Sequence, residues 1–462
     1  MLAREVLQEL IQVLGAENVL TEQEDLLTYA YDATAAMTHH KPDVVVSPLS
    51  TEQVAEVVKI AVRYNIPIYP RGSGTNLSGG TIPAKGGIVL SMLNLNKILE
   101  VDQDNLTATV QPGVIIQALN DEVMKIGLIY PPDPGTVTTA TMGGSVSECS
   151  GGLRGLKYGV TKHYIMGLKI VLANGEVIRW GGKTVKNVTG YDLVALFTGA
   201  EGTLGIITEI IVKLIPAPEA RKSILAVFDD LDNAGRAIAS IIRNKIIPAT
   251  LEIMDNVTIQ TVENFVHAGL PMDAEAVLLV EVDGYKEVVE REAVLVEQIL
   301  KEEKAVEVKI AKDDKERDLI WLARRSALPA LAQKRPTTVL EDATVPRSKI
   351  PDMLKAIRKI ADKHKLNIAT FGHAGDGNLH PTILTDQRDE DEMKRVHMAV
   401  DEIFQAAISL GGTLSGEHGI GVAKMKYLDW EFGEAGVAAL RRLKEALDPN
   451  YLLNPGKMVR RD

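Results

Sequence analysis

The feature that most restricts how this chain can fold is the density of glycine between Leu128 and Gly205. This span contains the stretches PPDPGT, TMGGSVSECSGGLRG and FTGAEGTLGII. Because glycine has no side chain, such density is typical of backbone packed closely against other backbone or against a ligand. A disordered loop is the simpler alternative, but GLKIVLANGEVIRWG and GIITEIIVKLIPAP are interposed and have the pattern of strands. The sequence therefore predicts an ordered, glycine-lined region with a hairpin turn at residues 173–176.

Before this span, predicted helices and strands alternate. The segment STEQVAEVVKIAVRYN has a capping box from Ser50 to Gln53, and its apolar residues then recur at helical spacing. The segments IPIYP, GGIVLSM and LTATVQPG have the composition of strands. The first region is therefore expected to mix α and β structure.

The pattern changes after a proline-containing boundary, IPAPEA, at residues 215–220. From Ser223 onward the chain predicts a strand, a helix and a strand, and the same order returns from Ala276. Two such units predict a ferredoxin-like antiparallel sheet backed by helices.

Composition disfavours several classes of function. The 462 residues carry a net charge of -11, which disfavours nucleic acid and anionic membranes as partners. The single cysteine, Cys149, excludes an internal disulfide and a Cys-ligated iron–sulfur cluster. The N-terminus lacks the apolar core of a signal peptide, and no stretch approaches the roughly 18 apolar residues of a membrane span. We therefore expect a cytoplasmic protein without a transmembrane segment, whose electrons, if it moves any, pass to another molecule.

The loop RGSGTNLSGG, residues 71–80, does not fit either of two common nucleotide-binding motifs. As a P-loop it lacks the phosphate-contacting lysine. As a dinucleotide fingerprint it lacks the third glycine, and a strand follows it instead of a helix. What remains is a loop with many backbone N–H groups, hydroxyl side chains and Arg71, which suits a pyrophosphate. An ordinary turn has the same composition, so the loop by itself leaves both interpretations open.

The segment HAGDGNLH places histidines at both ends of a turn. Its Gly, Asp and Asn residues exclude a helix, and a tight reversal would bring His373 and His380 together as a metal requires. A glycine-rich turn with two incidental histidines is equally consistent with this sequence. This segment alone does not choose between them.

Six motifs taken together resemble a known family. In order they are PRGSGTNLSGG, PPDPGTVTTATMGGSVSECSGGLRGLKYGVTKHYI, KNVTGYDLVALFTGAEGTLGIITE, FGHAGDGNLHP, LSGEHGIG and LLNPGKM. They resemble the FAD-linked 2-hydroxyacid dehydrogenases of the vanillyl-alcohol oxidase superfamily, most of all those of the glycolate oxidase flavin subunit and D-lactate dehydrogenase type. The resemblance covers nearly the whole chain.

The resemblance implies an α+β fold with an FAD-binding domain in two parts and a ferredoxin-like cap domain that carries the substrate site. The FAD-binding parts would be residues 1–217 and 413–462, with the cap at 218–412. FAD is expected to be non-covalent, because the loop RGSGTN lacks the histidine that anchors flavin in covalent relatives. At Cys149 relatives commonly carry Asn, and we interpret Cys149 as a small buried residue and not as a flavin linkage. The residues implied to bind the cofactor are Arg71, Gly72, Ser73, Gly74, Thr75, Asn76, Ser78, Gly79, Pro134, Gly135, Thr136, Thr139, Gly143, Gly144, Ser147, Gly152, Tyr158, Gly159, Glu201, Gly202, Ile207 and Asn454.

The resemblance also implies the catalytic groups. In metal-dependent relatives the residues that match His373, His380 and Glu417 hold a divalent cation, and this ligand set suits Zn, Mn or Fe. His418 is then expected to act as the general base, since the ordinary pKa of histidine suits proton abstraction. Arg324 aligns with an arginine that binds the substrate carboxylate. The neighbouring Arg325 has the simpler interpretation of a solvated helix face.

These assignments predict oxidation of a small (R)-2-hydroxy acid, D-lactate or glycolate, to the 2-oxo acid. His418 would take the hydroxyl proton while a hydride passes from C2 to flavin N5. A larger dicarboxylate is disfavoured, because the Lys and Thr that relatives use for it fall near Leu340 and Leu328, which are apolar. Electrons would leave to an external acceptor: an electron-transfer flavoprotein, an iron–sulfur subunit, a quinone or, least expected, oxygen.

Two other functions stay open at the level of sequence. A metal-dependent hydrolase would use the two histidines and Glu417 to activate water, but it leaves the glycine-rich half unexplained. A non-catalytic flavin subunit of an electron-transfer complex would not need His418. The sequence does not identify the hydroxy acid, the acceptor, the metal or the oligomeric state. A homo-oligomer, a hetero-complex and attachment to a membrane through a partner therefore all stay open.

Overall fold

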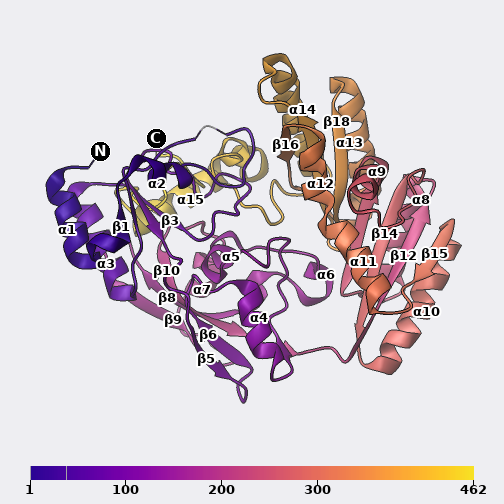
Figure 1. Cartoon of the computed structure of the whole chain (residues 1–462), viewed down its shortest axis with the longest axis horizontal. Coiled ribbons are helices and arrows are strands. Elements are labelled where there is room, and N and C mark those ends of the chain that lie inside the picture. Colours follow the sequence, from indigo (N-terminus) through magenta and orange to yellow (C-terminus); the bar gives the residue numbers. More distant parts are fainter. Residues whose placement is uncertain (1, 38, 462) are drawn as a thin grey trace. The chain divides into compact units, whose positions relative to one another are not determined.

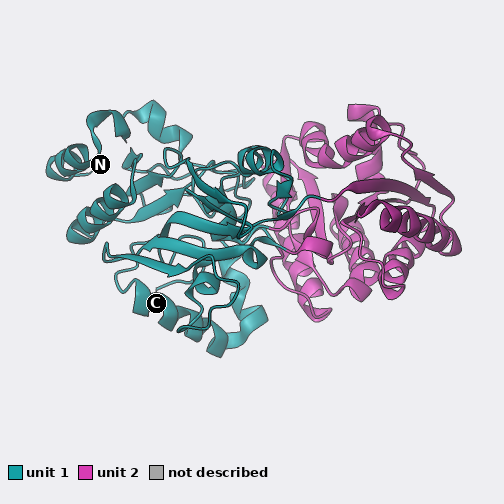
Figure 2. Ribbon diagram, turned by 90° about the horizontal axis from the view of Figure 1, so that it is seen from below, with its two compact units in different colours: residues 1–150, 160–217, 417–462 teal, residues 151–159, 218–416 magenta. Residues whose placement is uncertain are grey.

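The computed structural model describes residues 2–37 and 39–461, which form two compact units (Figure 1 and Figure 2). Unit 1 comprises Met1–Ser150, Val160–Ala217 and Glu417–Asp462, and unit 2 comprises Gly151–Gly159 and Pro218–Gly416. The C-terminal segment, yellow in Figure 1, therefore belongs to the same unit as the N-terminal half. Residues 151–159 and 413–416 lie in unit 2.

The first sheet of unit 1 has the strand order β1-β2-β4-β3, with β2, β4 and β3 parallel and β1 antiparallel. Helix α3 (Thr51–Tyr64) connects β2 to β3 and starts where the sequence predicts it. The Ser50 Oγ accepts from the Gln53 N–H, while the Gln53 side chain accepts from the N–H of Leu49 and not from that of Ser50. The strands are β1 (Val19–Leu20), β2 (Val44–Val46), β3 (Ile68–Arg71) and β4 (Ile88–Ser91).

The second sheet of unit 1 is antiparallel, with the order β5-β6-β10-β8-β9. The predicted hairpin turn is confirmed, because β8 and β9 pair across it and Gly175 takes the positive φ of 81° that the turn requires. Strands β8, β9 and β10, which the sequence predicts within and directly after the glycine-rich span, are thus confirmed as well. The bounds are β5 (Ile98–Asp102), β6 (Thr107–Val110), β8 (Ile165–Val171), β9 (Val177–Gly181) and β10 (Ile206–Lys213), with a separate pair β7 (Leu128–Ile129) and β11 (Ile215–Pro216).

Helices cover these sheets, and the C-terminal tail completes the first one. The Ile68 N–H donates to the Leu452 carbonyl at 2.8 Å, and the Asn454 N–H donates to the Ile68 carbonyl at 2.7 Å, so the tail runs parallel beside β3. This pairing ties the last residues of the chain to the start of the loop at residues 71–80. The helices are α1 (Arg4–Leu14), α2 (Gln23–Thr28), α4 (Ile116–Met124), α5 (Met142–Glu148), α7 (Leu193–Phe197) and α15 (Leu428–Leu447), with the 3-10 turns η1 (Ala16–Asn18), η2 (Thr161–His163) and η4 (Met425–Tyr427).

Unit 2 contains one large antiparallel sheet with the order β15-β12-β14-β13-β18-β19-β16, and β17 also pairs with β19. Its first four strands have the order of a ferredoxin-like sheet, which confirms the predicted cap fold. The hairpin β18–β19 extends that sheet beyond β13. The strands are β12 (Ala220–Phe228), β13 (Thr250–Asp255), β14 (Ala276–Gly284), β15 (Glu307–Ile310), β16 (Thr337–Leu340), β17 (Ala343–Thr344), β18 (Asn367–His373) and β19 (Asn378–Thr385).

The central strands of unit 2 are covered on both faces. Successive residues of β14 point to opposite sides, yet Ala276 to Asp283 are all buried. One face packs against α9 (Asn256–Val266), α11 (Asp314–Arg325) and α12 (Ala327–Lys334). The remaining elements are α6 (Gly155–Tyr158), α8 (Leu231–Arg243), α10 (Lys286–Glu302), η3 (Arg347–Lys349), α13 (Ile350–His364) and α14 (Glu390–Ser409).

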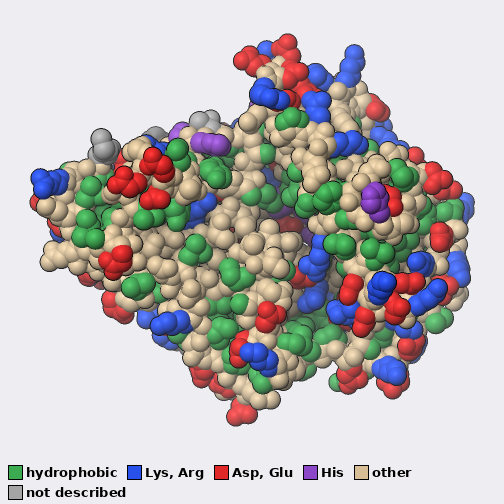
Figure 3. Space-filling view, in the orientation of Figure 1, with side chains coloured by type: hydrophobic (Ala, Val, Ile, Leu, Met, Phe, Trp, Pro, Cys, Tyr) green, Lys and Arg blue, Asp and Glu red, His purple; other side chains and the backbone are tan. Residues whose placement is uncertain are grey.

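The outer surface carries both signs of charge. On the face shown in Figure 3, acidic and basic side chains are interspersed. No helix within the described residues is both long enough and apolar enough to cross a bilayer.

Candidate active site

Unit 1 contains a hollow that is open to solvent. Its wall includes the end of β3, helix α5, the turn before β10 with the start of that strand, and the C-terminal tail. The predicted cofactor residues that line it are Arg71, Gly72, Gly143, Gly144, Ser147, Glu201, Gly202, Ile207 and Asn454. Gly80, the last residue of the predicted pyrophosphate loop, also lines it, and sequence reasoning did not single out the other lining residues, which are Pro70, Thr81, Met92, Pro112, Thr141, Glu148, Gly205 and Ile206.

The loop at residues 71–80 is held by its own side chains. The Asn76 Oδ1 accepts from the N–H groups of Ser78 and Gly80 at 2.8 and 2.6 Å, which fixes the turn. Arg71 is buried and donates to the Tyr31 carbonyl at 2.8 Å and to the Thr81 hydroxyl at 3.0 Å. This cation therefore stands in the wall of the hollow, where the sequence predicts contact with a pyrophosphate.

A buried group of ionisable side chains borders the hollow. Glu201 is 3% exposed and accepts from the Ile420 and Gly421 N–H groups at 2.6 and 2.8 Å. The pKa of Glu148 lies well above its ordinary value, mainly because the carboxyl is buried and secondly because the Glu201 carboxylate is nearby. Burial lowers the pKa of Lys457 to about 7, against the opposing effect of Asp32, Glu201 and Glu148.

Glu148 is the lining residue of most chemical interest that sequence reasoning missed. It lies inside the glycine-rich motif SECSGG, next to the predicted Ser147, and the position of a lone carboxylate among small residues is the signal that could have identified it. Gly419 packs against its carboxylate so closely that a Cβ there would overlap Glu148 Oε2. The glycine at 419 thus keeps room for two acids whose pKa values are both raised by burial.

His418 is anchored in unit 1 through its main chain. Its carbonyl accepts from the Ser78 Oγ at 3.0 Å and from the Asn76 Nδ2 at 3.5 Å. The N–H groups of Val422 and Ala423 both donate to the Ser78 carbonyl at 3.0 Å. The predicted base is thus tied to the same loop that borders the hollow, and its imidazole is 9% exposed.

In unit 2 the segment HAGDGNLH forms the tight reversal of a β-hairpin. Strand β18 ends at His373, β19 begins at Asn378, and His380 lies directly across from Phe371. Since residues two apart on a strand share a face, both imidazoles lie on the same side of the sheet, with ring centroids 5.1 Å apart. The convergence predicted from the turn is therefore present.

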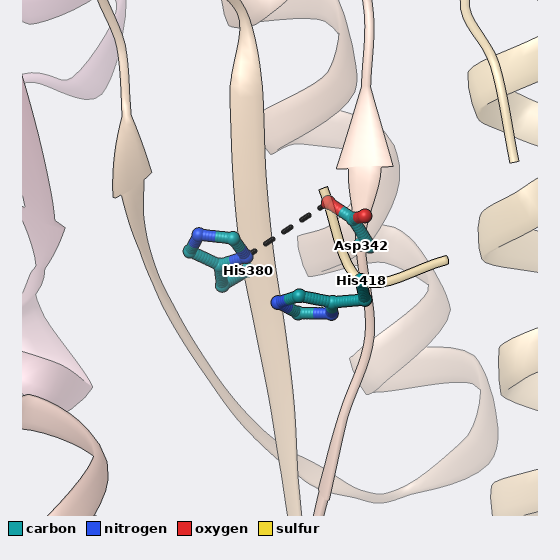
Figure 4. Close-up of side chains that lie close together, drawn as sticks. All are labelled: Asp342, His380 and His418. Carbon is teal, nitrogen blue, oxygen red and sulfur yellow. Dashed lines mark ion pairs between the residues drawn. The ribbon is translucent and has the colours of Figure 1, made fainter. Parts of the chain in front are cut away.

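Two buried carboxylates, neither anticipated from sequence, contact these histidines. Glu252 on β13 accepts a hydrogen bond at 2.7 Å from His373 Nδ1, with Oε1 as the acceptor. The second carboxylate belongs to Asp342, whose Oδ1 lies 4.0 Å from His380 Nδ1 (Figure 4). No motif marks either position in the sequence, because each is brought to a histidine by strand pairing across the sheet.

Asp342 also holds the segment that precedes the predicted ligand Glu417. Its Oδ2 accepts from the Ser415 hydroxyl and the Gly416 N–H, both at 2.8 Å. Glu417 follows Gly416 directly, so one peptide bond keeps its Cα about 3.8 Å from that of Gly416. Chain continuity thus links Glu417 and His418 to the part of unit 2 that contains Asp342.

Arg324 lies in the last turn of α11 and is 6% exposed. Its Nε donates to Glu252 Oε2 at 2.7 Å, its Nη2 lies 2.6 Å from the same oxygen in an ion pair, and its guanidinium stacks 4.8 Å from the Phe371 ring centroid. Burial alone would raise the pKa of Glu252, but Arg324 and then His373 outweigh it, and the pKa lies below its ordinary value. We call Glu252, Arg324, Phe371, His373 and His380 the histidine cluster.

Several predicted residues neither line the hollow nor belong to the histidine cluster as defined above. Arg325 is exposed on α11, and Leu328 and Leu340 pack against the core of unit 2. The predicted cofactor residues Gly152, Tyr158 and Gly159 belong to unit 2, where the Tyr158 hydroxyl donates to Asp283 at 2.7 Å. Those that belong to unit 1 without lining the hollow are Ser73, Gly74, Thr75, Asn76, Ser78, Gly79, Pro134, Gly135, Thr136 and Thr139.

Two family models together match most of the chain. Residues 42–181 match the family described as FAD binding domain, and residues 217–458 match that described as FAD linked oxidases, C-terminal domain. The chain is 52% identical to glycolate oxidase subunit GlcD of Bacillus subtilis (strain 168), over 100% of this chain and 98% of the relative. It is 35% identical to a D-lactate dehydrogenase of Anaerostipes hadrus, over 97% and 96% of the two chains. The crystal structure of p-cresol methylhydroxylase with substrate bound superposes with a TM-score of 0.83 at 20% identity, covering 98% of this chain and 96% of that one.

Proposed function

The chain belongs to the FAD-linked oxidases, and on that premise we propose that it oxidises a small (R)-2-hydroxy acid, D-lactate or glycolate, to the 2-oxo acid. The observation that carries the proposal is the full-length similarity to relatives named glycolate oxidase subunit and D-lactate dehydrogenase. Its oxidoreductase character follows from the family. The choice of hydroxy acid and the roles of individual residues are the proposal.

The hollow of unit 1 suits non-covalent FAD. When bound, FAD supplies the hydride acceptor of the reaction. Arg71 offers a cation to the pyrophosphate, and the glycines at 72, 143, 144 and 202 place backbone in the wall of the hollow. The site also contains Asn454, whose Nδ2 donates to the carbonyls of Gly80 and Glu201 and so joins two parts of the wall.

We assign the divalent metal to His373, His380 and Glu417. Two imidazoles and a carboxylate suit Zn, Mn or Fe, and the bond from His373 Nδ1 to Glu252 leaves Nε2 as the nitrogen for a metal. The metal, when bound, would polarise the 2-hydroxyl of the substrate. Asp342 is a further carboxylate close to His380.

His418 and Arg324 complete the proposed chemistry. The His418 imidazole takes the proton of the 2-hydroxyl as hydride leaves C2, and its main-chain bonds to Ser78 and Asn76 hold it in register with the flavin-binding loop. The substrate carboxylate pairs with Arg324, whose Nη1 is not used by Glu252. Leu328 and Leu340 leave this region apolar, which favours a small monocarboxylate.

The acceptor of the electrons is proposed to be a separate protein or a diffusible carrier. The similar GlcD proteins of Bacillus subtilis and Escherichia coli are named as subunits, which supports association with other subunits here. The chain has one cysteine, Cys149, too few for an iron–sulfur cluster of its own.

The test is anaerobic reduction of the flavin of the purified, FAD-loaded protein. D-lactate, L-lactate, glycolate and D-2-hydroxyglutarate are added separately, and loss of the visible flavin absorbance is recorded. We expect bleaching by D-lactate or glycolate and none by L-lactate. Absence of bleaching by all four acids, with FAD bound and metal supplied, would contradict the proposed function.

A further inference from the structure

Glu252 contacts both functional groups that we assign to unit 2. One carboxylate oxygen binds His373, a proposed metal ligand, and the other binds Arg324, the proposed partner of the substrate carboxylate. We infer that Glu252 is the positioning residue of this site: it sets the tautomer of His373 and the place of Arg324 together, so that metal binding and carboxylate binding depend on one side chain. This inference rests on the proposed function.

The first step concerns the proton on His373. An ionised carboxylate has acceptors only, and Glu252 faces the permanently charged Arg324 guanidinium on its other oxygen. His373 Nδ1, 2.7 Å from Oε1, must therefore carry the hydrogen. The lone pair of the ring is then on Nε2, the nitrogen that would bind a metal.

The second step concerns Arg324. Its Nε and Nη2 converge on a single oxygen of Glu252, and the Phe371 ring stacks against the guanidinium. Both charged side chains are buried, Glu252 completely. Removal of one charge would leave the other without compensation, so the position of Arg324 depends on Glu252.

The third step is that both contacts come from rigid elements of the sheet. Glu252 lies on β13, which pairs with β18 at Ile253 and Met254, and β18 ends at His373. Arg324 comes from α11, which packs on the same face as Phe371. A strand, a hairpin and a helix are thus joined at one carboxylate.

The decisive variant is Glu252→Gln, because the amide has only one acceptor. Arg324 has no acceptor atoms, so the amide oxygen must face Arg324 and the NH₂ group must face His373. Nδ1 then has to accept, and the hydrogen moves to Nε2, where it blocks the metal. We expect Zn²⁺ affinity, measured by competition with a chromophoric chelator, to fall by about 10- to 100-fold with FAD content unchanged.

Glu281→Gln is the matched control. Glu281 is a buried glutamate on the neighbouring strand β14, and it binds Ser223 and Trp321 instead of a histidine or Arg324. We expect it to retain wild-type Zn²⁺ affinity. Equal Zn²⁺ affinity of Glu252→Gln and the wild type would overturn the inference, as would an equal loss in the control.

Glu252→Asp guards against a failure of the Gln variant to fold. It keeps the negative charge and the acceptor-only oxygens, so we expect its Zn²⁺ affinity to fall by less than about 10-fold relative to the wild type, and a larger loss would overturn the inference. Flavin bleaching and Zn²⁺ binding also test the two proposals independently. A wild type that is not bleached by any hydroxy acid contradicts the proposed function, whereas unaltered Zn²⁺ binding in Glu252→Gln contradicts only the role of Glu252.

Discussion

The hollow of unit 1 is walled largely by glycine and main-chain groups, whereas the histidine cluster of unit 2 is made of charged and aromatic side chains that contact one another directly. In the hollow, Gly202 packs against Pro70 and Gly143 packs against Pro112, so neither glycine has space for a Cβ. In the cluster, Glu252 of β13 and Arg324 of α11 form a buried ion pair where the helix packs on the sheet. The first site is therefore sensitive to added atoms and the second to removed ones.

The two sites achieve selectivity in different ways. Backbone walls fit a large, invariant group whose phosphates accept many N–H bonds, and they tolerate little change in shape. Side-chain clusters fix individual charges, and a small change in one hydrogen-bonding group alters the chemistry without altering the fold. Three predictions use this contrast, in addition to those for flavin reduction and for Glu252.

The largest expected effect is that of His418→Ala. The main-chain bonds from Ser78 and Asn76 remain in this variant, so FAD binding should be retained, while loss of the base should lower kcat by about 10²- to 10⁴-fold. The measurement is steady-state turnover together with the flavin content of the purified protein. His397→Ala, on the exposed side of α14, is the control and should behave as wild type. Full turnover in His418→Ala would favour the non-catalytic flavin subunit.

An intermediate effect is expected from Gly202→Ala. The residue has a positive φ of 66°, and a Cβ would come within 2.5 Å of Pro70 Cγ, so both strain and overlap result. The free energy of unfolding should fall by about 1 to 3 kcal/mol, with weaker FAD binding, as measured by urea denaturation and flavin fluorescence. Gly182→Ala is the control, because a Cβ there meets no atom within 4 Å. Wild-type behaviour of Gly202→Ala would break the contrast between the two sites.

The smallest expected effect is a pH dependence that arises from Lys457. Its pKa is lowered by burial to about 7, while the unfolded chain keeps the ordinary value near 10.5. Between these values the unfolded state binds more protons, so stability should rise with pH from 7 toward 10. The neutral amine has two N–H groups, which match its two acceptors, the Ile82 carbonyl and Asn454 Oδ1.

Urea denaturation of the wild type and of Lys457→Met at pH 7 and pH 9 isolates this contribution. The wild type should gain roughly 1 to 2 kcal/mol more than the variant over this range. Identical pH profiles of the two proteins would show that Lys457 stays charged in the folded state.

Local sequence was sufficient to predict those elements whose structure depends only on neighbouring residues. The Ser50 cap and the apolar repeat of α3, the Asn-Gly turn between β8 and β9, and the reversal between His373 and His380 were all predicted from neighbouring residues. Each depends on hydrogen bonds or side-chain directions within a few positions of the chain.

The sequence alone was enough to identify the family and the two short motifs that contain His373, His380, Glu417 and His418. Only the tertiary structure brought Glu252 to His373, Asp342 to His380 and Glu148 to Glu201. Those carboxylates are 38 to 121 residues from their partners in the chain, and no periodicity marks them. Their contacts are created by strand pairing and burial, which depend on the whole sheet and not on any one segment.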